Sequence, residues 1–211
     1  MKLLYSKKNI IVVENDITIK KMFNSESDFL TELNFYEQFN EFEYIPKLKK
    51  VEKMILHLEY IQGDNIYNCS KLPKFLLAKT LANFHNQTYN MNTNTAILHY
   101  DTNLNNYIFK DDRFYMFDFS DISIGNPISD VYSTLLFFCE HLDTKDFAFF
   151  YRDFIILYMQ NISFSFIPNE DVFKEEVNRF ERRREDSGKC IYNYDKFLVN
   201  KAAIENLKLP N

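Results

Sequence analysis

The first third of the chain alternates between short apolar runs and polar breaks. β-Branched runs over 9–13 and 17–23, separated by Glu14-Asn15-Asp16, predict a hairpin. Apolar residues then recur at helical spacing over 25–39, behind a serine-to-aspartate pair with the spacing of a capping box. An apolar run over 53–60 predicts a further strand. The front of the chain is therefore expected to be rich in β-structure.

The remainder of the chain follows mostly the helical period. We expect a helix over 72–86 and a second hairpin from short strands at 107–110 and 114–117. Further helices are predicted over 129–141, 147–161, 169–185 and 195–207. The change of pattern falls near Gly63, so we predict two domains, residues 1–63 and residues 64–211.

Composition adds limits rather than a function. The chain has 211 residues, is 46% hydrophobic and 17% aromatic, and so can bury a core. A net charge of −5 argues against a nucleic-acid partner. The three cysteines, Cys69, Cys139 and Cys190, are widely spaced and predict neither a zinc site nor a disulfide framework. No signal-peptide or membrane-spanning stretch is evident, which predicts a cytoplasmic protein without membrane contact and leaves open a secreted bacterial effector.

One segment carries a pattern typical of phosphoryl transfer. His99 to Asn106 has the form H-x-D-x-x-x-x-N, and the second predicted hairpin separates it from Asp118-Phe119-Ser120. Such chemistry needs a carboxylate that accepts the proton of the acceptor hydroxyl, and oxygen ligands that hold Mg²⁺ on the nucleotide phosphates. We therefore assign Asp101 as the catalytic base, and Asn106 and Asp118 as metal ligands.

A second candidate site lies in the front of the chain. Ile17-Thr-Ile-Lys20 has the form of the V-A-I-K strand, whose lysine binds phosphates and pairs with a helix glutamate. Glu32 lies on the following predicted helix and suits that role. Lys21 competes with Lys20, because strand alternation places the two side chains on opposite faces. We favour Lys20 because the four residues that end at Lys20 match the motif.

The later charged residues have less specific interpretations. Acidic positions after Asp118, Glu140 among them, are able to attract a cationic acceptor, but such positions are more often solvated helix faces. The run Arg182-Arg183-Arg184 suits an acidic or phosphorylated partner, but is more often a helix surface near a C-terminus.

Together these motifs resemble the aminoglycoside phosphotransferase and choline-kinase-like family. The match rests on His99–Asn106, on Asp118-Phe-Ser-Asp121 and on Ile124-Gly-Asn-Pro-Ile-Ser-Asp130, which is similar to the family's G-D-P-x-x-D segment. Leu58–Gly63 resembles the connector between the two lobes of that family, and Leu81-Ala-Asn-Phe-His85 resembles its L-A-x-L-H helix.

The resemblance implies an α+β, bilobal protein-kinase-like fold, with a small β-rich N-lobe and a mostly helical C-lobe. It implies ATP and Mg²⁺ as cofactors, with adenine beside the connector at Glu59, Tyr60 and Ile61. It also implies that Asp130 caps its helix and braces the catalytic loop.

The chain departs from the family at points that bear on activity. No glycine precedes Gly63, so a glycine-rich phosphate loop is absent and the Glu14-Asn-Asp turn is expected to cover the phosphates. Asn103 replaces the usual basic residue two positions after the base.

Three functions remain open from the sequence. The first is an ATP-dependent phosphotransferase, a kinase that moves the γ-phosphate to the hydroxyl of a small molecule. The second is a minimal atypical serine/threonine protein kinase with a protein substrate. The third is a nucleotide-binding pseudokinase that serves as a partner-binding module. A metal-dependent phosphohydrolase is a more distant fourth.

Overall fold

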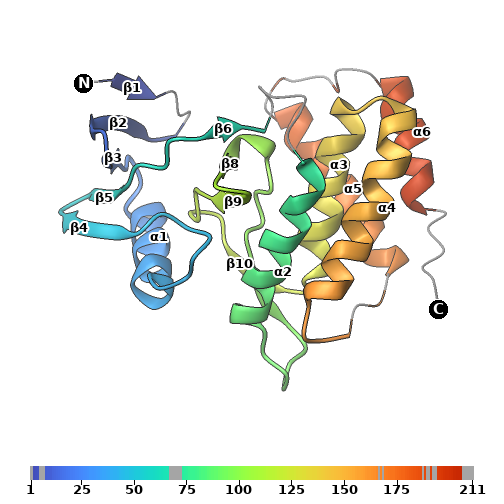
Figure 1. Cartoon of the computed structure of the whole chain (residues 1–211), viewed down its shortest axis with the longest axis horizontal. Helices are drawn as coiled ribbons and strands as arrows, with labels where there is room; N and C mark the ends of the chain where they lie inside the picture. Colours follow the sequence, from blue (N-terminus) through green and yellow to red (C-terminus); the bar gives the residue numbers. More distant parts are fainter. Residues whose placement is uncertain are drawn as a thin grey trace. The chain divides into compact units, whose positions relative to one another are not determined.

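The protein consists of two compact units (Figure 1). The structure is a computed structural model that describes residues 2–4, 8–66, 73–165, 167, 169–186, 188, 191 and 194–205, so Cys69 and Cys190 lie outside the described residues. The first unit comprises residues 1–72 and 105–122, and the second comprises residues 73–104 and 123–211.

This division differs from the single boundary predicted after residue 63. The hairpin of β8 (Tyr107–Lys110) and β9 (Arg113–Met116) belongs to the first unit. The reason is a sheet that it forms with β6 (Asp64–Asn65), in the order β6-β8-β9. The chain thus leaves the first unit and returns to it for residues 105–122.

An antiparallel sheet of five strands forms most of the first unit, in the order β1-β2-β3-β5-β4. The strands are β1 (Lys2–Leu4), β2 (Ile10–Asn15), β3 (Thr18–Met22), β4 (Leu48–Glu52) and β5 (Ile55–Glu59). The predicted first hairpin is β2–β3, and the strand predicted over 53–60 is β5. Strands β1 and β4 were not predicted.

Helix α1 (Glu26–Phe39) lies beside this sheet (Figure 1). Ser25 is its N-cap as predicted, and its side chain accepts a hydrogen bond from the backbone N–H of Asp28, which is one half of the predicted capping box. Phe29 packs edge-on against Phe23, the residue that follows β3. This contact joins the start of α1 to the end of the strand that precedes it.

Gly63 permits a close approach of the connector to β8. A Cβ atom at this position would lie 2.3 Å from the carbonyl oxygen of Phe109 and 2.7 Å from the side chain of Ile108. A larger residue would therefore clash with β8 at this position. This steric requirement adds to the chain break that the sequence predicted at Gly63.

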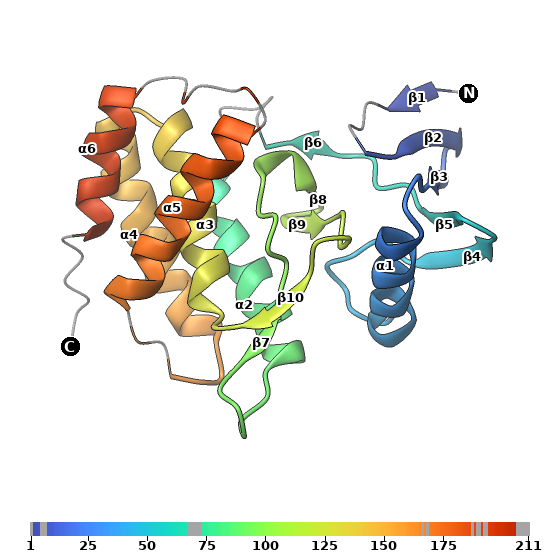
Figure 2. The ribbon, with the colours of Figure 1, turned by 180° about the vertical axis from the view of Figure 1, so that it is seen from behind.

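Helices make up most of the second unit (Figure 2). They are α2 (Leu77–Thr88) with a preceding 3₁₀ turn at Lys74–Leu76, α3 (Ile128–His141), α4 (Thr144–Asn161), α5 (Glu170–Asp186) and α6 (Tyr194–Glu205). Each lies close to its predicted range. Helix α3 is buried along almost its whole length and packs against α4, α5 and α6, so it forms the centre of this unit.

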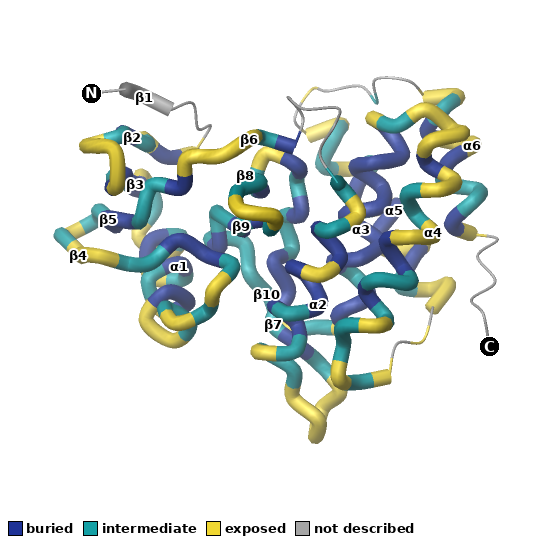
Figure 3. Tube along the Cα trace, viewed as in Figure 1, coloured by how far each residue is buried: buried dark blue, intermediate teal, exposed yellow. Residues whose placement is uncertain are grey.

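The second unit also contains a two-stranded sheet, whose strands lie before and after the predicted catalytic segment in the sequence. Strand β7 (Ala96–Leu98) pairs with β10 (Ser123–Gly125). The loop between α2 and β7 is exposed over residues 90–94, and is yellow in Figure 3. The sequence predicted neither strand.

Among the helices of the described residues, none combines the length and the apolar character that a membrane span requires.

Candidate active site

Lys21 is the centre of a buried charged cluster in the first unit. Its ammonium nitrogen lies 2.6 Å from Oε2 of Glu32 on α1 and 2.7 Å from Oδ1 of Asp118. The side chain of Lys21 is only 4% exposed and that of Glu32 is fully buried, whereas that of Asp118 is 36% exposed. The cluster therefore links the strand, the helix and the Asp118 segment at one ammonium group.

The prediction that Lys20 pairs with Glu32 was wrong. Lys20 instead forms an ion pair with Glu14, at 2.7 Å, and Lys21 pairs with Glu32. The two lysines do lie on opposite faces of β3, as strand alternation requires. Alternation alone does not say which face meets α1, and the residue facing the helix is Lys21.

The charges of this cluster support one another against the cost of burial. Burial alone would lower the pKa of Lys21, but the negative charges of Glu32 and Asp118 outweigh it and the pKa is raised. Burial raises the pKa of Glu32, and the charge of Lys21 opposes that shift. Lys21 is thus held as a cation, which is the form that binds phosphate oxygens.

Phe119 attaches the Asp118 segment to α1. Its ring stacks on Phe35 with centroids 4.0 Å apart and meets Tyr36 edge-on at 5.7 Å. All three rings are buried. The hydroxyl of Ser120 donates a hydrogen bond to Oδ1 of Asp118, at 3.1 Å. The residues around Asp118 are therefore fixed on both sides of its carboxylate.

The β8–β9 hairpin brings the two predicted metal ligands together. The backbone N–H of Phe117 donates to the carbonyl oxygen of Asn106, at 3.0 Å, and Asp118 follows directly. Asp118 has a φ of 65°, a left-handed conformation that is uncommon for a residue other than glycine. The hairpin thus compensates for twelve residues of sequence separation, as predicted.

An amide oxygen and a carboxylate form a donor set that fits Mg²⁺. This ion prefers oxygen ligands, keeps several of its waters and needs few groups from the protein. Within the described residues, no group of three or more His, Cys, Asp or Glu side chains forms an alternative metal site. Asn106 and Asp118 remain the ligands predicted from the sequence.

Lys8 lies beside the Asp118 segment and was missed by sequence reasoning. Its ammonium group lies 3.1 Å and 3.2 Å from the two carboxylate oxygens of Asp121. Burial opposes a charged Lys8, but the hydrogen bond to Asp121 and the charges of Asp121, Asp28 and Asp118 raise its pKa. Because Lys8 precedes β2, the start of the first unit supplies a cation beside the Asp118 segment.

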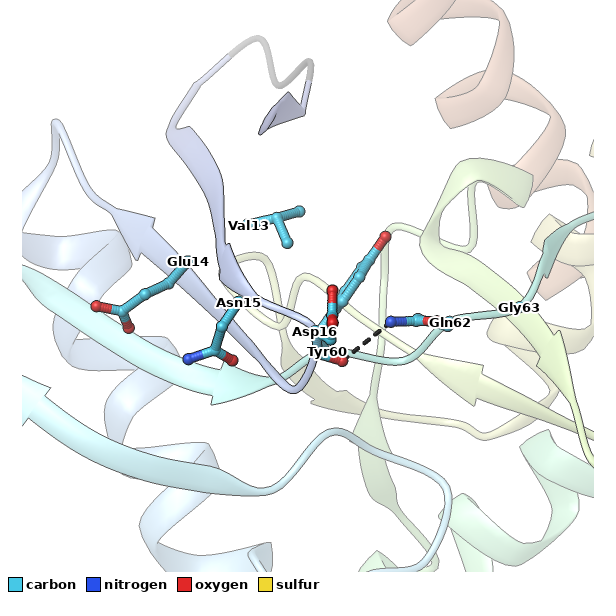
Figure 4. A pocket seen from close by; sticks show the side chains of 7 residues that line it. All are labelled: Val13, Glu14, Asn15, Asp16, Tyr60, Gln62 and Gly63. Atoms are coloured by element: carbon cyan, nitrogen blue, oxygen red, sulfur yellow. Dashed lines mark hydrogen bonds between the residues drawn. The ribbon is translucent and has the colours of Figure 1, made fainter. Parts of the chain in front are cut away.

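The predicted connector forms one wall of an open pocket of about 520 Å³ in the first unit (Figure 4). The pocket is lined by Val13, Glu14, Asn15, Asp16, Tyr60, Gln62 and Gly63. The side-chain amide of Gln62 donates to the carbonyl oxygen of Asp16, at 3.0 Å, and joins the connector to the β2–β3 turn. Of the predicted adenine contacts, only Tyr60 lines this pocket.

Backbone groups of the connector are partly committed within the unit. The N–H of Glu59 donates to the carbonyl of Lys47, at 2.8 Å, and the N–H of Tyr60 donates to that of Ile17, at 3.0 Å. The carboxylate of Glu59 accepts from the N–H of Lys47, at 3.3 Å, and Ile61 is 2% exposed. Glu59 and Ile61 therefore serve the packing of this unit.

Asp101 lies in the second unit, in the loop that follows β7. The preceding residues are fixed by Asp130 at the start of α3. Its carboxylate accepts the backbone N–H of His99 at 2.6 Å and that of Tyr100 at 3.0 Å, and lies 3.3 Å from Nε2 of His85. The predicted bracing of the loop before Asp101 is confirmed, and Asp130 lies in the first turn of its helix, where the N-cap residue is Pro127.

The electrostatics of Asp130 favour its charged form. Burial would raise its pKa, but the hydrogen bond from His85, the charges of His85 and His99 and the N–H of His99 hold the pKa below its usual range. Tyr100 has a φ of 65°, a left-handed conformation that is uncommon for a residue other than glycine. The bonds to Asp130 thus hold a strained backbone next to Asp101.

Two arginines of α5 meet the loop that carries Asp101. Nη1 of Arg183 donates to Oδ1 of Asp101 and to the carbonyl of Tyr100, each at 3.2 Å. The guanidinium carbon of Arg179 lies 3.9 Å from the centre of the Tyr100 ring. Arg184 pairs with Glu140, whose side chain is 3% exposed, so the interpretation of Glu140 as a solvated position was wrong.

Comparisons with known proteins agree with these observations. Residues 53–159, about half of the chain, match the family model described as the phosphotransferase enzyme family. None of the curated proteins matches the chain in sequence.

Solved kinase structures share the fold over almost the whole chain. A choline/ethanolamine kinase family protein from Mesorhizobium loti is similar with a TM-score of 0.64 and 9% identity, covering 97% of this chain and 92% of that one. The choline kinase LicA from Streptococcus pneumoniae gives 0.63 and 15%, with 96% and 91% covered.

A ternary complex of streptomycin, ATP and the aminoglycoside phosphotransferase APH(2")-IIa gives a TM-score of 0.58 and 17% identity, with 97% and 92% covered. The fold is therefore protein-kinase-like, with a β-rich first unit and a mostly helical second unit. From the family match, we conclude that the chain belongs to the phosphotransferase enzyme family.

Proposed function

We propose that this protein transfers the γ-phosphate of ATP to the hydroxyl of a small molecule. The observation that carries the proposal is the buried cluster of Lys21, Glu32 and Asp118. In kinases a strand lysine paired with a helix glutamate binds nucleotide phosphates, and an aspartate of the D-F-G segment holds the metal. The same three residue types occur here in the same order of strand, helix and D-F-S segment.

Each residue has a distinct role in this proposal. Lys21 binds the nucleotide phosphates, and Glu32 orients it. Lys8 adds positive charge and takes the place of the absent glycine-rich loop. Asn106 and Asp118 would hold Mg²⁺, which neutralises phosphate charge when bound. We assign the adenine base to the pocket beside Val13, Tyr60 and Gly63. The acidic β2–β3 turn that also lines this pocket would bind phosphates poorly, so the pocket suits the base better than the phosphates.

Asp101 acts as the base. The proton of the acceptor hydroxyl passes to its carboxylate as the acceptor oxygen bonds to the γ-phosphorus and the bond from that phosphorus to the bridging oxygen breaks. The products are ADP and a phosphate monoester. Asp130 holds the backbone before Asp101 and so positions the base, but does not itself contact the substrate.

Labelled ATP provides the test. The wild type is incubated with ATP labelled in the γ-phosphate, Mg²⁺ and a cell extract, beside D101N, D118N and the control D112N in the exposed β8–β9 turn. We expect label in a small metabolite with the wild type and D112N only. Label in protein bands would instead support a protein kinase. Binding of ATP that raises the melting temperature, with no transfer to any acceptor, would support a pseudokinase.

A further inference from the structure

The candidate base contacts one arginine, Arg183, and a second arginine, Arg179, lies over the ring of the neighbouring Tyr100. Arg179 and Arg183 are four residues apart on α5, so they lie on the same face of the helix, one turn apart. Both approach Tyr100, with guanidinium carbons 3.9 Å and 5.2 Å from its ring centre. Arg183 also contacts the Asp101 carboxylate. Two positive groups are thus held at the residues that would receive the acceptor.

The packing of Arg179 gives it a fixed orientation. Its side chain is 13% exposed, it lies over the Tyr100 ring, and its Nη2 pairs with Glu176. Its Nη1 is buried and has no hydrogen-bond acceptor among the described residues. A buried guanidinium donor without an acceptor is costly, because it has lost its water without gaining a partner. An oxygen atom of a ligand would satisfy it.

Arg183 is the more accessible of the two. Its side chain is 37% exposed, and its hydrogen bonds to Asp101 and to the Tyr100 carbonyl use the same nitrogen, Nη1. A guanidinium carries five N–H donors in a planar fork that matches carboxylate and phosphate oxygens. Arg183 is therefore able to keep its contact with Asp101 and still bind an oxyanion.

From this geometry we infer that the acceptor carries an anionic group, phosphate or carboxylate, and that Arg179 and Arg183 bind it next to Asp101. The inference rests on the proposed function, whose acceptor class it specifies. The anionic group would place the hydroxyl at Asp101 for the transfer described above. Choline, whose quaternary ammonium is a permanent cation, would be repelled by the same two arginines.

The other arginines of α5 have different surroundings. Arg184 is held between the Phe137 and Phe180 rings and paired with Glu140. Arg182 is exposed and contacts the backbone carbonyl of Asn178. Arg182 is therefore a matched control, because it has the same charge on the same helix without contact to Tyr100 or Asp101 in the described structure.

Anion binding is tested on protein saturated with ADP and Mg²⁺, so that added phosphate does not bind in place of a nucleotide. Inorganic phosphate or acetate is titrated while the side-chain N–H signals of the arginines are followed by NMR. We expect saturable shifts in the wild type, an affinity at least about tenfold weaker in R183Q, partial recovery in R183K and no change in R182Q. Comparison of the affinities for phosphate and acetate shows whether the site prefers a phosphate or a carboxylate group.

Two results would overturn the inference. One is the absence of saturable binding of either anion to the wild type, and the other is equal binding by R183Q and R182Q. Melting temperatures of all variants exclude misfolding as the cause of a loss.

Turnover then tests the acceptor class with four primary alcohols. With ATP and Mg²⁺, glycerol 3-phosphate or 3-hydroxypropanoate should exceed glycerol and choline in kcat/KM, and R183Q should remove most of that preference. Preferred turnover of choline would overturn the inference but leave the proposed function intact. A wild type that binds phosphate at Arg183 but transfers no phosphoryl group from ATP would instead count against the proposed function.

Discussion

The ring of Phe119 lies flat on the ring of Phe35, with centroids 4.0 Å apart and planes inclined by 19°. The contact connects the segment of Asp118 to the helix of Glu32, since Phe35 lies one turn after Glu32 on α1. A buried aromatic pair within the first unit therefore couples the position of α1 to the position of Asp118, the candidate metal ligand.

Replacing Phe119 by Ala should lower both stability and nucleotide binding. Loss of a fully buried phenylalanine costs about 3–5 kcal/mol, and the Asp118 segment loses its anchor. Urea unfolding and ATP titration measure the two effects. F149A, at a position 63% exposed on α4, is the control and should change neither. Weaker stability with unchanged ATP affinity would show that the stack does not position Asp118.

The Lys21 assignment predicts different results for two adjacent lysines. K21M should lower kcat/KM for ATP about 10–100-fold, the equivalent of the roughly 1.5–3 kcal/mol of a hydrogen bond to a charged group. K20M removes only the partner of Glu14 and should leave turnover nearly unchanged. Steady-state kinetics of the two variants test this assignment. A larger loss of kcat/KM in K20M than in K21M would favour Lys20, the residue preferred from the sequence.

A double variant separates the chemistry of Lys21 from its structural role. K21M alone leaves the fully buried Glu32 without its lysine, which costs about 3–5 kcal/mol. K21M/E32L replaces the buried pair by apolar groups and should recover most of that stability. Activity should stay low, because the cation is still absent.

Asp130 should stabilise the catalytic loop through its charge. In D130N, one of the two backbone N–H groups, of His99 or Tyr100, loses a charged acceptor, at a cost of about 2–3 kcal/mol at neutral pH. The control D146N removes an exposed first-turn aspartate of α4 and should cost at most about 1 kcal/mol.

The pH dependence of D130N has a definite sign. Because the folded-state pKa of Asp130 lies below its ordinary value of 3.8, its contribution is present above that value and is lost as the pH falls below it. The difference between wild type and D130N should therefore narrow below about pH 4 in urea unfolding. A constant difference down to pH 2 would contradict the role of the charge.

Local pattern predicted those parts of the fold that have a clear period. Both hairpins and the helices of the second unit follow apolar repeats, and their ends fall within a few residues of the predicted ones. Strand β4 was not predicted, because three of its five residues are exposed and its sequence, Leu-Lys-Lys-Val-Glu, has no apolar alternation. Edge strands of this kind are specified by their neighbour rather than by their own sequence.

Contacts between distant residues were the part that sequence alone left undetermined. Motif spacing was enough to propose Asp101, Asn106 and Asp118, but the choice between Lys20 and Lys21 depends on which face of β3 meets α1. The pairing of Arg183 with Asp101 joins residues 82 apart. A run of three arginines predicts a helix surface, and only the packing of α5 distinguishes Arg183 from Arg182.

Because Glu176 is buried, we expect the free energy of unfolding to fall as the pH rises towards neutrality. Burial raises its pKa to about 7, against the opposing charge of Arg179, and the nearby charge of Asp130 adds to the shift. Between its ordinary value of 4.5 and about 7, the folded state keeps a proton that the unfolded state has released, so stability falls as the pH rises through this window.

Replacing Glu176 by Gln should remove this slope. Relative to E176Q, the wild type should lose at most about 3 kcal/mol of unfolding free energy between pH 4.5 and 7, and nothing further above pH 8. E175Q, at the exposed neighbouring position, should keep the wild-type slope. Urea unfolding at half-unit pH steps measures all three proteins. If the slopes of E176Q and E175Q coincide, Glu176 titrates as an ordinary surface carboxylate, and its contact with Arg179 would then leave that arginine neutralised throughout the window.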